Sequence, residues 1–138
     1  DLSRTKISKK YRIPIVEDNC ESMGSVIGSK KLGSFGIASS HSLYYGHHIS
    51  TIEGGLVSTK DKDLYNIFLA LRSHGWARDM EKNYRRKLEK KYKVNEFESL
   101  YTFYFSGFNI RSTDLNAALG INQLKRLDSN NQKRNPGF

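Results

Sequence analysis

Apolar residues occur along this chain in two spacings, short continuous runs and a repeat of three to four residues. The runs predict strands over residues 12–16, 37–45, 56–59 and 100–105. The repeat predicts helices over residues 2–11, over 61–73, and from 112 or 113 to about 128. Short strands between helices predict an α/β layer structure, in which residues 13–16 form an inner strand and the last helix packs in the core.

Two segments lack either spacing. Glycines punctuate residues 24–36, which we interpret as a short hairpin or loop, and neither a GxGxxG fingerprint nor a P-loop is present. Residues 76–99 are strongly charged and weakly periodic, which predicts an exposed helix and a loop. Asp61 is a good N-cap for the helix that precedes this segment, and His74-Gly75 closes that helix.

The net charge of the chain raises the question of a polyanionic partner. The chain has 138 residues, 37% of them hydrophobic, which suits one packed domain or a large piece of one. Its 23 Lys and Arg against 14 Asp and Glu give a net charge of +9, as for a protein that binds a polyanion. Much of the excess lies in residues 4–12 and 82–93, however, where a solvated helix face is the simpler interpretation. Without a nucleic-acid module in the sequence, we expect no nucleic-acid partner.

Cysteine content and apolar run length exclude further classes. Cys20 is the single cysteine, so neither an internal disulfide nor a cysteine cluster for zinc or iron–sulfur can form, and a reducing compartment fits. Apolar runs of only a few residues and the lack of an N-terminal leader favour a cytoplasmic protein without a membrane partner. Since the chain begins within a predicted helix and stops at residues 135–138 without a folded terminus, we expect a fragment.

Candidate chemistry is concentrated in residues 41–55, HSLYYGHHISTIEGG. A predicted strand reaches Gly46 and then presents the adjacent pair His47-His48, and imidazoles exchange protons near neutral pH. Acidic residues also follow the strand that ends at Val16, and the carboxyl ends of parallel strands are where open α/β sheets bind ligands. An acidic turn after a strand is commonly only a cap for the next element, and a lone histidine is usually structural, so each feature alone is weak.

Three blocks in register strengthen this picture. Residues 15–22 (IVEDNCES), 38–42 continuing through 53–55 (ASSHS and EGG), and 107–115 (GFNIRSTDL) together resemble the DegT/DnrJ/EryC1/StrS sugar aminotransferase family. The resemblance implies the aspartate-aminotransferase fold, with a mainly parallel sheet flanked by helices, and pyridoxal 5'-phosphate as cofactor. It further implies that residues 1–138 are a partial large, cofactor-binding domain, with the N-terminal part and the small C-terminal domain absent.

Site residues follow from the same resemblance, position by position. Asp18 matches the aspartate that pairs with the pyridine nitrogen of the cofactor, which strengthens the ring as an electron sink. Ser42 matches the serine that binds the cofactor phosphate. Asn109 matches an asparagine that reaches the phosphate from the partner subunit, which implies a homodimer with a composite active site. Glu21 stands where the aminotransferases usually have a glutamine near the ring hydroxyl. No metal site is implied.

His47 is the main departure from the family pattern. It occupies the position of the lysine that bonds covalently to the cofactor, and imidazole has no primary amine, so an acid/base role is what remains. This exchange resembles the nucleotide-sugar 3-dehydratase branch, similar to the enzymes that act on GDP-4-keto-6-deoxymannose. A sister branch also has the histidine but binds an iron–sulfur cluster through several cysteines, and the single Cys20 disfavours it.

The branch implies a specific reaction. The cofactor works as pyridoxamine 5'-phosphate, held noncovalently, and condenses with a nucleotide-linked 4-keto-6-deoxy sugar; His47 moves the proton, the 3-hydroxyl leaves, and glutamate regenerates the amine. Such a reaction belongs to deoxysugar and O-antigen biosynthesis. Two alternatives remain: a nucleotide-sugar aminotransferase of the same family, and a non-catalytic relative that binds the cofactor or a sugar after losing the lysine.

Overall fold

The structure is a computed structural model that describes residues 2–134. It contains two compact units, one made of residues 1–60 and 112–138 and the other of residues 61–111. Within the described residues, no helix combines the length and apolar character that a membrane crossing requires.

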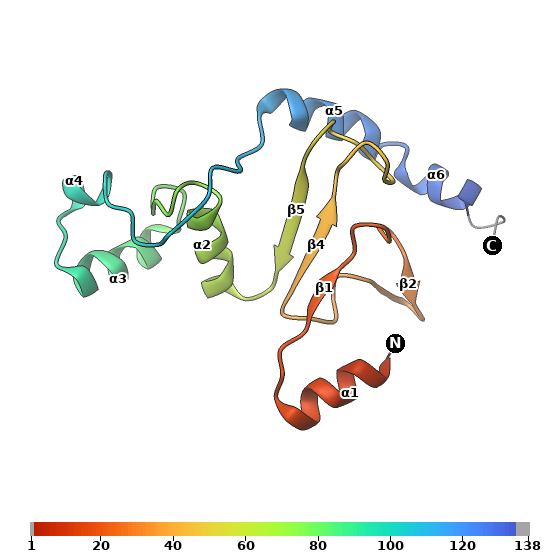
Figure 1. Ribbon diagram of the computed structural model, residues 1–138, viewed down its shortest axis with the longest axis horizontal. Coiled ribbons are helices and arrows are strands. Elements are labelled where there is room, and N and C mark those ends of the chain that lie inside the picture. Colours follow the sequence, from red (N-terminus) through yellow and green to blue (C-terminus); the bar gives the residue numbers. More distant parts are fainter. Residues whose placement is uncertain (1, 135–138) are drawn as a thin grey trace. The chain divides into compact units, whose positions relative to one another are not determined.

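The first unit is built on a three-stranded sheet with the order β1-β4-β5 (Figure 1). Its strands are β1 (Val16–Asp18), β4 (Ala38–Ser42) and β5 (Gly55–Thr59). β1 and β4 run parallel, whereas β5 returns antiparallel to β4 after the loop 43–54. The predicted hairpin in residues 24–36 is confirmed as β2 (Val26–Ile27) paired with β3 (Lys30–Lys31). Three helices, α1 (Leu2–Tyr11), α5 (Asp114–Leu124) and α6 (Leu127–Arg134), complete the unit.

The prediction of a buried strand over residues 12–16 was wrong in its boundaries. The backbone of Arg12 is left-handed, with φ 55°, where α1 ends, and Pro14 has no N–H to give to a strand ladder. Ile13 is 58% exposed, so the segment is also not buried within the described chain. The strand begins only at Val16 and includes the two acidic residues that the sequence assigned to a turn.

Glu17 fixes the parallel pair on one side of the sheet. Its carboxylate accepts hydrogen bonds from the backbone N–H groups of Gly33 (2.7 Å), Phe35 (2.7 Å) and Gly36 (2.6 Å), so one side chain holds the loop that leads into β4. Burial raises the pKa of Glu17, but these hydrogen bonds and the nearby Lys30 outweigh it and hold the pKa below its ordinary value of 4.5. Glu17 is therefore a carboxylate throughout the neutral range.

We expect Glu17→Gln to lower the free energy of unfolding by about 1–2 kcal/mol at pH 7, because an amide group cannot accept all three hydrogen bonds as an anion does and the site is partly solvated. Since the folded-state pKa is lowered, the carboxylate stabilises the fold above its ordinary pKa of 4.5, and that stabilisation is lost as the pH falls through the folded-state value. Urea unfolding of both proteins from pH 7 to pH 3 measures this. A difference that stayed constant with pH would contradict it.

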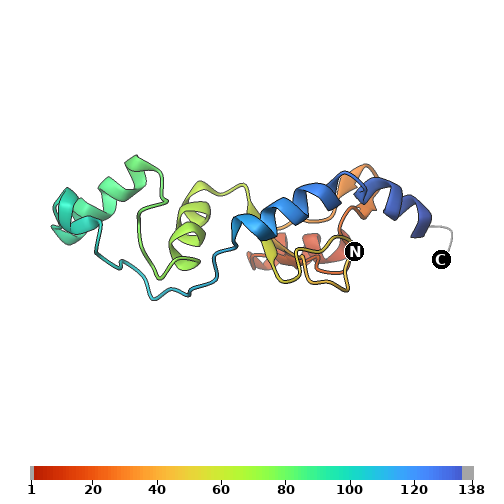
Figure 2. The same cartoon turned by 90° about the horizontal axis from the view of Figure 1, so that it is seen from above.

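The predicted core helix near residues 112–128 is replaced by two helices, α5 and α6, separated by Lys125 and Arg126 (Figures 1 and 2). The prediction that this helix lies in the core was wrong for the described chain, since α5 contains no buried residue. Leu115 is 80% exposed and Leu124 is 58% exposed. Polar side chains of α5 make its tertiary contacts instead, as the site shows below.

The second unit packs α2 (Lys62–Leu71) against α3 (Lys82–Tyr92). As predicted, the Asp61 side chain caps α2 by accepting from the N–H groups of Asp63 and Leu64. The core of this unit consists of Ala70, Ala77, Met80 and Leu88. The helix and loop predicted for residues 76–99 form, with the short helix α4 (Glu96–Ser99) as an addition. The prediction that the segment is exposed was only partly right, since Ala77, Met80 and Leu88 are buried in the core.

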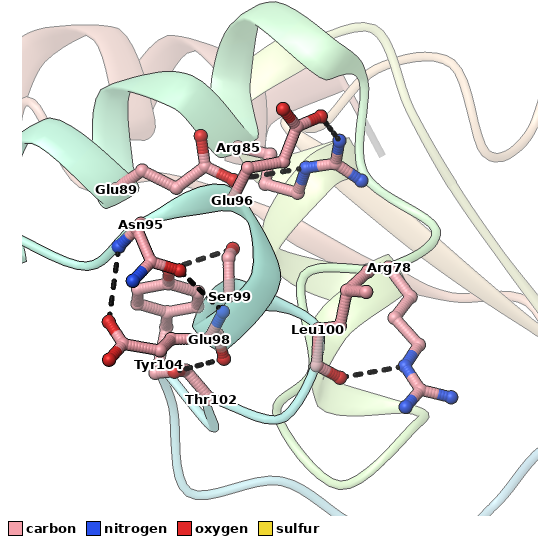
Figure 3. A network of polar contacts seen from close by, with 10 residues as sticks. All are labelled: Arg78, Arg85, Glu89, Asn95, Glu96, Glu98, Ser99, Leu100, Thr102 and Tyr104. Carbon is pink, nitrogen blue, oxygen red and sulfur yellow. Dashed lines mark hydrogen bonds and ion pairs between the residues drawn. The ribbon is translucent and has the colours of Figure 1, made fainter.

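A polar network joins α3 to α4 (Figure 3). Arg85 pairs with Glu89 at 3.3 Å and with Glu96 at 3.8 Å, and the Asn95 side chain accepts from the N–H of Glu98 to cap α4. The buried Ser99 hydroxyl lies 2.9 Å from the Tyr104 hydroxyl. The charges on the inner face of α3 are thus paired, and its remaining basic residues face solvent.

The strand predicted over residues 100–105 does not form. Phe103 makes an isolated bridge with Trp76, and the N–H of Tyr104 donates to the Gly75 carbonyl at 3.0 Å. Gly75 has φ 91°, and a Cβ there would lie 1.8 Å from the Phe105 carbonyl oxygen, so the two segments approach each other more closely than a side chain allows. The apolar run therefore pairs with a loop instead of a second strand.

Candidate active site

Asp18 and Ser42 end neighbouring parallel strands. Asp18 is the last residue of β1 and pairs in register with Ser40 of β4, whose hydroxyl donates to the Asp18 carboxylate at 3.2 Å. Ser42 ends β4 and stands two residues beyond Ser40, so it shares the face that Ser40 presents. Asp18 and Ser42 therefore lie on one face of the sheet, at the carboxyl edge of the parallel pair.

The surroundings of Asp18 favour its charged form. Hydrogen bonds from the Cys20 thiol, from the Cys20 backbone N–H (3.2 Å) and from the Ser40 hydroxyl hold the pKa of Asp18 below its ordinary value of 3.8. The same interaction raises the pKa of the Cys20 thiol. The edge thus carries a permanent, solvent-exposed anion, which suits a positively charged group on a ligand.

His47 lies in the loop 43–54, which leaves this edge and returns as β5. Two backbone hydrogen bonds close the base of the loop, from Leu43 to Gly54 (2.9 Å) and from Thr51 to Leu43 (2.8 Å). The N–H of His47 donates to the Tyr44 carbonyl at 3.1 Å, and the two rings meet edge-on with centroids 5.8 Å apart. The His47 ring is half-buried. It is therefore held on an ordered loop at the same edge as Asp18 and Ser42.

His48 and Glu21 are neighbours in the wall of one cavity of this unit. Both line a cavity of about 490 Å³ between the segment 21–26 and helix α6, which contributes Asn131 and Arg134. Burial lowers the pKa of His48, with Arg134 and His47 adding to the effect, and its buried Nδ1 has no hydrogen-bond partner among the described residues. Asp18, Ser42 and His47 do not line this cavity. Glu21 and His48 thus share a cavity that begins three residues after Asp18 in the chain and that the other candidates of this unit do not line.

Asn109 belongs to the second unit. Its segment runs along the end of α2, where Phe108 donates to the Leu71 carbonyl at 2.7 Å and Ile110 donates to the Arg72 carbonyl at 3.1 Å. Asn109 itself pairs with Ser73 in an isolated bridge, and its side chain is exposed. The backbone is therefore fixed while the amide is available to a ligand or a partner chain.

Residues of α5 that contact the histidine loop were missed from the sequence. The Asn116 side chain donates to the Thr51 carbonyl at 2.7 Å, and the Gln123 side chain accepts from the Ser50 N–H at 3.0 Å. The sequence pattern predicted this helix only as an apolar core helix. Asn116, Gly120 and Gln123, spaced by four and three residues, form a polar stripe that could have pointed to this contact.

Known proteins similar to this chain include sugar 3-dehydratases and sugar transaminases. GDP-4-keto-6-deoxy-D-mannose 3-dehydratase of Yersinia pseudotuberculosis is 41% identical over 125 residues, which are 91% of this chain and 31% of that protein. A UDP-4-amino-4,6-dideoxy-N-acetyl-beta-L-altrosamine transaminase of Campylobacter jejuni (strain 81-176) is 35% identical over 136 residues, which are 94% of this chain and 30% of that protein. This chain therefore spans about a third of the length of these relatives.

Solved structures confirm the predicted α/β aminotransferase fold. A crystal structure of a GDP-4-keto-6-deoxymannose-3-dehydratase mutant, with histidine replaced by asparagine and GDP-perosamine bound, matches with a TM-score of 0.79 at 38% identity. The match covers 91% of this chain and 32% of that one. An E. coli enzyme of the same name with bound hydrated PLP matches with a TM-score of 0.75 at 35% identity and with the same coverage.

The predicted family is confirmed as well, because the family model described as the DegT/DnrJ/EryC1/StrS aminotransferase family matches residues 3–137, nearly the whole chain. This chain belongs to the DegT/DnrJ/EryC1/StrS aminotransferase family.

Proposed function

We propose that this chain is part of the large, cofactor-binding domain of a cytoplasmic enzyme that removes the 3-hydroxyl group from a nucleotide-linked 4-keto-6-deoxy sugar. The observation that carries this proposal is His47, an imidazole on the hydrogen-bonded loop that follows Ser42, at the position where the resemblance has the family's lysine. Support comes from the relatives named 3-dehydratases, at 41% identity over most of this chain.

The residues at the sheet edge fit pyridoxal phosphate. Asp18 is an exposed anion that would accept a hydrogen bond from a protonated ring nitrogen. The Ser42 hydroxyl would donate to a phosphate, while its oxygen accepts from the Tyr44 N–H at 3.2 Å. Glu21, three residues after Asp18, would accept a hydrogen bond from the ring hydroxyl. When bound, the cofactor supplies an electron sink and, in its amine form, the nitrogen that condenses with the sugar. The fit needs no metal, and no cluster of three His, Cys, Asp or Glu that could hold one occurs within residues 2–134.

His47 then moves a proton. A lysine in its place would hold the cofactor covalently, but an imidazole can only accept a proton at one ring nitrogen and return it. Asp18, Ser42 and, from a second subunit, Asn109 would therefore hold the cofactor without a covalent bond. Because water reaches the exposed carboxylate of Asp18 in this chain, the rest of the protein must cover the edge during reaction.

The test uses the full-length protein with a 4-keto-6-deoxy nucleotide sugar, pyridoxal phosphate and glutamate. Ammonia released together with loss of the 3-hydroxyl supports the dehydratase. A 4-amino sugar would show an aminotransferase, the alternative favoured by the 35% identity to the Campylobacter transaminase. Neither product would indicate a non-catalytic relative.

We also propose that the active protein is a homodimer in which Asn109 serves the cofactor of the neighbouring subunit. Mixing inactive Asp18→Asn and Asn109→Asp subunits is expected to restore about a quarter of the wild-type activity, because half of the dimers are mixed and each mixed dimer has one intact site. Activity of the re-equilibrated mixture measures this, with each variant alone as control. No recovery would place both residues in the same subunit's site.

A further inference from the structure

The turn that follows the two histidines contains a strained residue. Ile52 has φ 74°, a left-handed conformation that is strongly disfavoured for a side chain with a branched Cβ. Its side chain is 65% exposed, so burial of that side chain does not compensate for the strain. A strained backbone persists only where its surroundings fix it, and such sites cluster near functional residues.

Side chains of α5 fix this turn from both sides. The Nδ2 of Asn116 donates to the Thr51 carbonyl at 2.7 Å and to the Glu53 carbonyl at 3.4 Å, which are the carbonyls flanking Ile52. The Oε1 of Gln123 accepts from the Ser50 N–H at 3.0 Å. Two residues of one helix thus hold the backbone immediately before and immediately after the strained position.

The helix is a firm base for these contacts. Asn116 also forms a capping box with Thr113, so the side chain that holds the turn is itself fixed at the start of α5. Gly120 lies between Asn116 and Gln123 on the same stripe, and a Cβ there would lie only 3.0 Å from the Thr51 methyl group. Figure 1 shows α5 beside the end of β4 and the start of β5, between which this turn lies. Close approach of helix and turn therefore requires the glycine.

The turn 50–53 also restricts the position of His47. Thr51 is buried and donates its N–H to the Leu43 carbonyl, which closes the loop. Ile49, the one residue between His48 and Ser50, is also buried. Only two residues, His48 and Ile49, separate His47 from the Ser50 N–H that Gln123 holds. A shift of the turn along α5 would therefore move the imidazole relative to Asp18 and Ser42.

We propose that Asn116 and Gln123 are positioning residues for His47: they clamp the strained turn 50–53 onto α5 and thereby set where the imidazole stands at the sheet edge. The proposal rests on the proposed function for the role of His47, but the clamp itself does not. Misplacing a proton-transfer group by a fraction of an ångström to about 1 Å lowers kcat with little effect on substrate binding.

Asn116→Asp in the full-length protein tests the clamp. The carboxylate keeps the oxygen that caps α5 and suits the helix N-terminus, but it cannot donate to Thr51 and Glu53. We expect kcat to fall about tenfold, the KM for the nucleotide sugar and the melting temperature to change little, and amide exchange in residues 43–54 to become faster. Asn122→Asp, the same change at an exposed position of α5, is the matched control and leaves all four quantities near wild type. Unchanged kcat in Asn116→Asp, or equal losses in both variants, overturns the proposal.

Ile52→Gly is a second, independent test of the proposal that the turn positions His47. Glycine adopts the left-handed conformation without strain, so the melting temperature is expected to stay the same or rise, while the turn exchanges faster and kcat falls. Lower activity in a protein of equal or higher stability is a result that a purely structural role does not produce. Full kcat in this variant contradicts positioning by the turn. If the wild-type protein releases no ammonia, the proposed function fails, whereas the exchange measurements still decide whether Asn116 holds the turn.

Discussion

His47→Asn in the full-length protein is expected to lower kcat for the dehydration by about 10²–10⁴-fold, the usual contribution of a general acid–base group. Asparagine approaches the size of imidazole but cannot accept and return a proton. Asp18 and Ser42 hold the ring nitrogen and the phosphate independently of residue 47, so the dissociation constant for the cofactor should change little. Single-turnover kinetics with saturating cofactor separate the proton-transfer step from binding.

His48→Asn is the control for this substitution. His48 faces the cavity lined by Glu21 and Arg134, and its pKa is lowered by burial, so it stands in a different environment from its neighbour. We expect His48→Asn to retain most of the activity. Equal losses in both variants, or full activity in His47→Asn, would mean that the acid/base group is assigned to the wrong histidine.

His47→Lys tests the same assignment by a gain of chemistry. A lysine amine at this position can bond covalently to pyridoxal phosphate, so borohydride reduction should leave a modified lysine in the peptide that contains residue 47. Wild-type protein should give no adduct in that peptide. The variant should also shift products toward the 4-amino sugar, because an ammonium group can return a proton to the cofactor carbon and complete amine transfer.

The placement of Asp18 and Ser42 could be predicted in part because both residues lie at the ends of strands. Residues after a buried strand and before a glycine are recognisable from pattern, and Asp18 and Ser42 do lie on one face where two parallel strands end. However, the strand that carries Asp18 was predicted over residues 12–16, whereas it spans Val16–Asp18. Pro14 and the left-handed Arg12 delay the ladder, while pairing with Ser39 and Ser40 draws the acidic residues into the strand.

The sequence pattern did not predict the contacts between segments that are distant along the chain. Residues 100–105 have strong β propensity, but propensity forms a strand only where an edge accepts it, and here the bonded neighbours are Gly75 and Trp76. The apolar spacing of α5 indicated a core helix, whereas its tertiary contacts come from Asn116 and Gln123. The stripe formed by Asn116, Gly120 and Gln123 marks one helix face in the sequence, but it does not show which backbone, 65 or 73 positions away, that face meets.

Asp18→Asn is expected to have the other large effect, a loss of about 10²–10³-fold in kcat, which is typical when a preorganised electrostatic partner is removed. The substitution is nearly isosteric, and the remaining amide oxygen can still accept from the Cys20 N–H and the Ser40 hydroxyl, so the edge should keep its shape. What is lost is the negative charge that keeps the ring nitrogen protonated.

The control for this loss is the same chemical change one residue earlier. Glu17 points to the opposite face, where it holds the loop at Gly33 and Gly36, so Glu17→Gln should cost stability and leave the kcat of folded enzyme near wild type. Because the pKa of Asp18 is lowered, its charge persists to pH values below 3.8, and wild-type activity should show no acidic limb from this group near neutral pH. If Asp18→Asn retained wild-type kcat while Glu17→Gln lost it, the carboxylate that serves the cofactor would be the other member of this acidic pair.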